Sequence, residues 1–139
     1  MKKILLSGLM LLIMVSVFAQ KNTDVDRSSA EAITQDFVEK YNLTDAQTVK
    51  MLKIQQRKLK NDSEIAPLEA IDIDKYLAKM SGNEQQTNFS IRRILDRDQV
   101  EILIKDEHEL RTKRATVSSK MQKEGATPLE IKKALIKVN

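Results

Sequence analysis

One local pattern occurs twice in this chain, and each time it precedes a long amphipathic stretch. Residues 43–47 read Leu-Thr-Asp-Ala-Gln, and residues 95–99 read Leu-Asp-Arg-Asp-Gln. In each copy a residue that caps helices well stands three positions before a glutamine, which is the spacing of a capping box. Two long helices are therefore predicted to begin here. Each is expected to bear a mostly apolar stripe at alternating spacings of three and four residues. The first stripe is at Val49, Leu52, Gln56 and Leu59. The second, in which two of the seven positions are charged, is at Val100, Leu103, Glu107, Leu110, Arg114, Val117 and Met121.

The composition points to an all-α fold. The 139 residues include three Gly, two Pro, no Cys and no Trp, and only 4% are aromatic. Such a chain favours helices and offers little to a β-sheet. We expect four to six helices in a single domain over residues 29–139.

The segments between the two long helices carry further signals. The first long helix is expected to end near residues 61–63, and residues 63–64 offer a cap for a helix with Pro67 in its first turn. The Ser-Gly pair at 81–82 predicts a break. Asn83 is then expected to cap a helix over residues 84–95, with an apolar set at Phe89, Ile91, Ile94 and Leu95.

Both ends of the helical region also show boundary signals. Ser29 is predicted to cap a helix over residues 30–40. The second long helix is expected to end near Lys123, because Gly125 is suited to the position that follows a helix. Thr127, with Pro and Glu at the next and third positions, predicts the start of a last helix.

The N-terminus has the layout of a secretory signal peptide. Two lysines follow Met1, an apolar run covers residues 4–18, and small residues precede Gln20. An uncleaved anchor is the alternative, but residues 4–19 span only about 24 Å as a helix, and a bilayer core is about 30 Å thick. We predict cleavage after Ala19, export to the periplasm of a Gram-negative bacterium, and a flexible polar tail over residues 20–28.

Charge narrows the class of partner. Removing the signal peptide takes away Lys2 and Lys3 and lowers the net charge from +4 to +2, which argues against a nucleic-acid partner. The remaining basic side chains concentrate on the long helices. A solvated helix face with no function is one interpretation, and a cationic surface for acidic or partly unfolded proteins is the other. The candidate residues for that surface are Lys50, Lys53, Arg57, Arg92, Arg93, Arg97, Arg111 and Arg114.

Catalytic and metal-binding motifs are missing from the sequence. The chain has one His and no Cys, and it contains no G-x-S-x-G, P-loop or H-E-x-x-H pattern. The same-face helical neighbours of His108 are poor metal ligands, and Asp72 and Asp74 fit a loop or cap better than a calcium loop. We expect no enzyme activity, no cofactor and no metal site.

The repeated pattern resembles the L-T-x-x-Q motif of the Spy/CpxP family of periplasmic proteins. Residues 43–47 match it in full, whereas residues 95–99 carry Asp96 where the family has Thr. Asp caps a helix equally well. The resemblance covers about residues 30–123. Structural roles are expected at Leu43, Thr44, Gln47, Leu95, Asp96 and Gln99.

The resemblance implies a bent antiparallel helical hairpin, usually in a cradle-shaped homodimer. Family members include an ATP-independent chaperone that holds unfolding proteins, a regulator of a stress-sensor kinase and a zinc-binding protein. The expected function is thus a holdase-type chaperone or envelope stress-response protein. A regulator of one specific partner is the alternative, and metal binding is the least supported.

Overall fold

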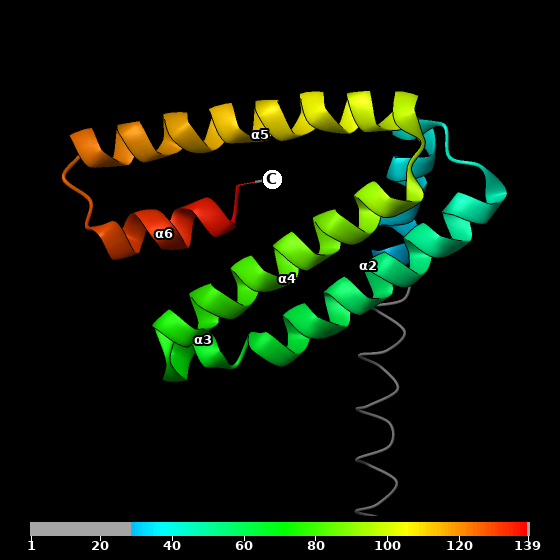
Figure 1. Ribbon diagram of the computed structural model, residues 1–139. Coiled ribbons are helices and arrows are strands. Elements are labelled where there is room, and N and C mark those ends of the chain that lie inside the picture. Colours follow the sequence, from blue (N-terminus) through cyan, green and yellow to red (C-terminus); the bar gives the residue numbers. More distant parts are fainter. Residues whose placement is uncertain (1–28, 139) are drawn as a thin grey trace, which may run out of the picture.

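The computed structural model describes residues 29–138, and all regular secondary structure in that range is helical (Figure 1). The predicted all-α class with four to six helices is confirmed. A first helix covers residues 29–41. The other helices are α2 (Asp45–Ile65), α3 (Leu68–Ile71), α4 (Ile73–Ile94), α5 (Arg97–Lys123) and α6 (Pro128–Ile136).

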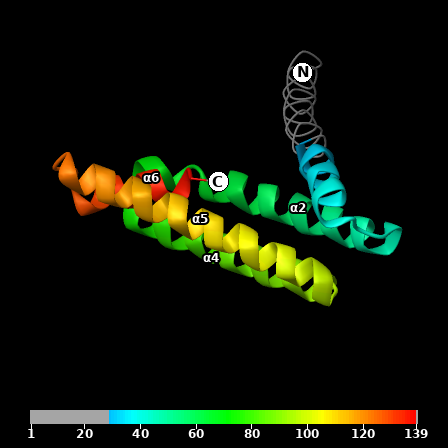
Figure 2. The ribbon, with the colours of Figure 1, turned by 90° about the horizontal axis from the view of Figure 1, so that it is seen from above.

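The long helices form a V-shaped arrangement. Helices α2 and α4 lie side by side and antiparallel, with the short α3 at the turn between them (Figure 1). At residues 95–96 the chain turns back into α5, which diverges from α4 and lies over it when viewed from above (Figure 2). Helix α6 then returns into the open side of the V and packs against both α4 and α5.

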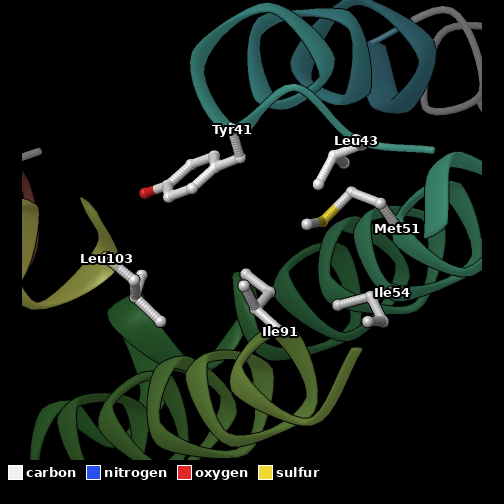
Figure 3. Close-up of a cluster of buried hydrophobic side chains, with 6 residues drawn as sticks. All are labelled: Tyr41, Leu43, Met51, Ile54, Ile91 and Leu103. Atoms are coloured by element: carbon white, nitrogen blue, oxygen red, sulfur yellow. The ribbon is translucent and has the colours of Figure 1, made fainter. Parts of the chain in front are cut away.

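The apolar core lies at the closed end of the V, where α2 and α5 begin. Six buried side chains from four helices and one connecting segment meet there (Figure 3). Met51 is completely buried, and full burial of such a side chain is worth roughly 1.5–3 kcal/mol. The cluster comprises Tyr41, Leu43, Met51, Ile54, Ile91 and Leu103.

The structure of α4 differs from the prediction for the middle of the chain. The expected break at residues 81–82 and the expected cap at Asn83 are wrong, because α4 runs unbroken through them. Asn83 is buried, and its amide donates to the Lys58 carbonyl at 3.1 Å and to Asp62 Oδ1 at 2.8 Å. It also accepts a bond from Asn61 at 2.8 Å. These contacts with α2 hold the helix together across a locally weak sequence.

The turn between α2 and α4 also differs from expectation. Residues 63–64 belong to α2, which extends to Ile65, so they cap no helix. Pro67 stands at the N-cap of α3, not in its first turn. Asp72 caps α4 by accepting a bond from the Lys75 backbone N–H at 3.0 Å, so its interpretation as a cap residue is confirmed.

The predicted stripes of the two long helices fare differently. On α5 the stripe faces the rest of the molecule, with Leu103 buried and its other members half-buried. On α2 the prediction is wrong for Val49, which is 57% exposed, whereas Leu52, Gln56 and Leu59 are half-buried. The buried residues of α2 are Met51, Ile54 and Gln55. The core at the closed end of the V therefore draws in a different face of α2 from the one that heptad spacing selects.

The ends of the helical region largely match the sequence. Helix α5 ends at Lys123, Gly125 follows with a φ of 80°, and Thr127 caps α6 in a capping box with Glu130. Ser29, however, already lies inside the first helix and is not its cap. The predicted signal peptide and tail fall outside the described residues and stay predictions. Along residues 29–138 no helix is both long and apolar enough to cross a bilayer.

Candidate functional site

The first repeated motif forms the predicted capping box at the start of α2. Thr44 Oγ1 accepts a hydrogen bond from the Gln47 backbone N–H at 3.3 Å. In return, Gln47 Oε1 accepts one from the Thr44 backbone N–H at 2.9 Å. Asp45 adds a negative charge in the first turn, where the helix dipole favours it. The expected role of Thr44 and Gln47 in starting this helix is confirmed.

The second motif does the same at the start of α5 with Asp in place of Thr. Asp96 Oδ1 accepts a bond from the Gln99 backbone N–H at 2.9 Å, and Gln99 Oε1 accepts one from the Asp96 backbone N–H at 2.9 Å. Leu43 and Leu95, which precede the two caps, belong respectively to the buried core and to its partly buried surroundings. The Asp substitution thus preserves the capping geometry.

The two motif glutamines also bond directly to each other. Gln47 Nε2 donates to Gln99 Oε1 at 2.7 Å, and Gln99 Nε2 donates to Gln47 Oε1 at 3.1 Å. Each glutamine further donates to a backbone carbonyl two residues before the other motif's cap: Gln47 to Ile94 at 2.9 Å, and Gln99 to Asn42 at 3.4 Å. The two motifs are therefore joined with approximate two-fold symmetry, which holds the first turns of α2 and α5 together.

A second polar contact supports this junction from the first helix. The Tyr41 ring stacks on Phe37, with centroids 5.4 Å apart, and its hydroxyl donates to Asp106 of α5. Lys40 Nζ lies 2.8 Å from the other oxygen of Asp106. Burial, followed by the hydrogen bond to Asp106 and its charge, raises the pKa of Tyr41 well above its ordinary value. The hydroxyl therefore remains a donor that ties the first helix to α5.

Three of the predicted basic residues form a stripe on α2. Lys50, Lys53 and Arg57 are exposed and recur at a spacing of three and four, so they share one helix face. The two lysines form no ion pair within residues 29–138. Arg57 donates to Ser90 of α4 at 2.8 Å. That bond places the Arg57 end of the stripe beside α4.

Helix α4 carries an exposed aromatic ring at the residue before Ser90. Phe89 is 62% exposed, so the prediction that it belongs to the same apolar face as Ile91 is wrong. The guanidinium of Arg93, one turn later, lies over the Phe89 ring at 5.6 Å from its centroid. We call the surface made by Lys50, Lys53, Arg57, Phe89 and Arg93 the cationic face.

The other predicted basic residues lie elsewhere and differ in their contacts. Arg92 forms a two-pronged pair with Glu107 of α5, at 3.0 and 2.8 Å. Arg114 is half-buried and pairs with Glu84 of α4 at 2.8 Å. Both pairs bridge the two arms of the V. Arg97 and Arg111 are exposed on α5 and form no ion pair within the described range.

The described residues contain no group of three or more His, Cys, Asp or Glu side chains placed to hold a metal ion. His108 is exposed on α5, where its backbone carbonyl accepts a bond from Thr112. The acidic pair at Asp72 and Asp74 lies at the start of α4, where it serves the helix terminus.

The sequence predicted the motif residues and the basic residues of α2, but it did not predict two features of the site. It did not pair Gln47 with Gln99, and it assigned Phe89 to the core. A hint for Phe89 was Arg93 four residues later, a spacing that allows the cation to cover the ring. Compared with known proteins, the chain gives no significant match to a family model, a curated protein or a solved structure.

Proposed function

We propose that this protein is an exported, ATP-independent holdase that binds partly unfolded proteins on its cationic face. The observation behind the proposal is the exposed Phe89, which has the Arg93 guanidinium over its ring and lies on the helix that packs against the basic stripe of α2. The four basic residues of the face form no ion pair within residues 29–138. Export rests on the signal-like N-terminus, with the periplasm as the proposed compartment. The resemblance of the repeated motif to the Spy/CpxP family supports the same function.

The physical argument starts from what an unfolding protein exposes. Such a chain presents apolar side chains among polar and acidic ones, with no fixed geometry. Lysine and arginine stems provide apolar contact while their charges stay in water, and flexible contacts of this kind accept many sequences. The charges also accelerate encounter with acidic segments. No nucleotide is required, because release follows when the client folds or the charges are screened.

The test is suppression of aggregation by the purified 20–139 chain without ATP. Light scattering of a thermally aggregating, acidic test protein is expected to fall near equimolar ratio. The effect should weaken at high salt, because the Debye length shortens from about 10 Å at 0.1 M to about 3 Å at 1 M. Absence of suppression at several-fold excess would reject the holdase and favour a regulator of one specific partner.

Matched variants connect the activity to the cationic face. Phe89→Ala and the double reversal Lys50→Glu with Lys53→Glu are expected to weaken suppression. Ile71→Ala removes an even more exposed apolar side chain from α3, and Lys105→Glu reverses an exposed charge on α5. If these controls weaken suppression as much as the face variants do, the assignment of the face is wrong even where holdase activity is real.

A homodimer is part of the proposal. Outside the cationic face, the described helices leave Val49, Ile71 and Ile104 substantially exposed, and a second copy would cover some of this apolar surface. Sedimentation equilibrium of the 20–139 chain decides this directly. A monomer at every accessible concentration would remove the dimer without affecting the holdase assay.

A further inference from the structure

Helix α6 occupies the open side of the V without filling it. Of its nine residues only Ile131 is buried. An open hollow of about 450 Å³ lies on one side, lined by Leu77 of α4 and by Leu135 and Ile136 of α6. A second of about 290 Å³ lies on the other, lined by Met80, Leu110 and again Ile136. Solvent-open hollows therefore border α6, and Ile131 is the one residue of this helix that is buried in the groove between α4 and α5.

The polar contacts of α6 are equally sparse. Arg114 Nη2, already paired with Glu84, donates to the Val138 carbonyl at a long 3.3 Å. Arg114 Nε is buried and has no partner. A buried donor without a partner is unfavourable, because it has lost its hydrogen bonds to water without gaining others. The groove therefore holds a cation whose hydrogen-bonding capacity α6 does not use in full.

The charge of the groove matches that of α6. Asp74 of α4 lines the first hollow together with Lys132 of α6, and it has no ion pair within residues 29–138. Glu84 and Asp62, the other acidic side chains of the two hollows, are paired with Arg114 and Lys58, which line the hollows too. The negative charge left unpaired therefore comes from α4, while α6 carries lysines at 132, 133 and 137. Its apolar face repeats at Ile131, Leu135 and Val138, the spacing of an amphipathic helix.

We propose that the α4–α5 groove is a binding site for amphipathic helical segments of other proteins, and that α6 is its displaceable internal occupant. The partner is a segment with apolar residues at intervals of three and four and with lysine or arginine on its flanks. This deepens the proposed holdase function by naming a class of client segment. It uses a different surface from the cationic face, which suits acidic segments.

An added helical segment must compete with α6 for the groove, and this competition lowers the apparent affinity of the segment. A tethered segment acts at an effective concentration that reaches millimolar for short linkers, and α6 follows α5 after only residues 124–127. The intact chain should therefore bind an added helix weakly. Weakening α6 should raise the apparent affinity in proportion to the fraction of open grooves.

The probe is a fluorescent peptide with the α6 sequence, residues 126–139, measured by anisotropy against the 20–139 chain. Ile131→Asp in the protein expels α6 from the groove and is expected to tighten peptide binding at least about tenfold. Leu129→Asp makes the same change at an exposed α6 position and should bind the peptide as the unmodified chain does. A peptide that itself carries Ile131→Asp should bind to neither.

Equal peptide affinity for the Ile131→Asp variant and the unmodified chain overturns the proposal. Should that variant lose its helical signal, native-state hydrogen exchange on the unmodified chain decides instead. Backbone amides of α6 are expected to exchange much faster than those of α4 and α5. Exchange of all three helices at one common rate would show that α6 does not leave the groove. These readouts involve no aggregating protein, so the groove and the holdase fail or succeed separately.

Discussion

The coupling between Gln47 and Gln99 can be measured with a double-mutant cycle. Gln99 is 6% exposed, and its amide bonds to the Tyr41 carbonyl, the Asp96 N–H and Gln47. Each such bond contributes about 1 kcal/mol net, and a buried partner left unpaired costs more, so Gln99→Ala should lower the free energy of unfolding by about 3 kcal/mol. Gln47 is only half-buried, and Gln47→Ala should cost about 2 kcal/mol.

The double variant should cost less than the sum of the single variants. Each single substitution already removes both bonds between the glutamines, so that loss is counted twice in the sum. We expect the double variant to fall short of additivity by about 1 kcal/mol, within the range typical of residues in direct contact. Losses of this size are a large part of a domain stability of roughly 5–15 kcal/mol.

The assay is urea denaturation of the 20–139 chain, followed by far-ultraviolet circular dichroism. Gln86→Ala is the matched control, because Gln86 is an exposed glutamine on α4. It should change the free energy of unfolding by no more than about 0.5 kcal/mol. Additivity of the Gln47 and Gln99 effects within about 0.3 kcal/mol would refute the direct coupling that the structure shows.

Two further substitutions test the junction. Thr44→Ala should cost about 1 kcal/mol by removing the N-cap of α2, and a urea midpoint equal to that of the unmodified chain would remove this role. Tyr41 has a pKa raised above its ordinary value of 10.0, so as pH rises the unfolded chain releases this proton first. Its contribution to stability is complete below about pH 10 and declines above it. Tyr41→Phe should therefore flatten the loss of stability above about pH 10, whereas Tyr76→Phe, at a less buried ring, should leave most of that loss in place.

The helix starts were predictable because their causes are local. A cap residue and a glutamine or glutamate three positions later satisfy each other's backbone groups regardless of the rest of the fold. The boxes at Thr44, Asp96 and Thr127 therefore appear in the structure as the sequence indicates. Gly125 likewise has the positive φ that is expected for a glycine directly after a helix, and this expectation depends only on the local sequence.

Continuity through residues 81–82 was not predictable for the opposite reason. Ser and Gly weaken a helix locally, by up to about 1 kcal/mol for Gly relative to Ala. What outweighs this is the contact of Asn83 with Asn61 and Asp62, some twenty residues earlier in the chain. Asn is a good cap and a poor helix former, so only the packing of α2 against α4 reveals its role in the interior of a helix.

The junction itself shows how a short repeat acquires a role that neither copy has alone. Each glutamine amide has one oxygen and two N–H donors. In an isolated capping box the oxygen is used and the donors face water. Here the fold brings together two amides that are 52 residues apart in the sequence, so each also donates to the backbone carbonyl two residues before the other motif's cap. A serine or threonine cap with glutamate at the third position, as at Thr127 and Glu130, offers no such donors. Glutamine at this position is therefore what converts two independent helix starts into one rigid corner, from which both arms of the V extend.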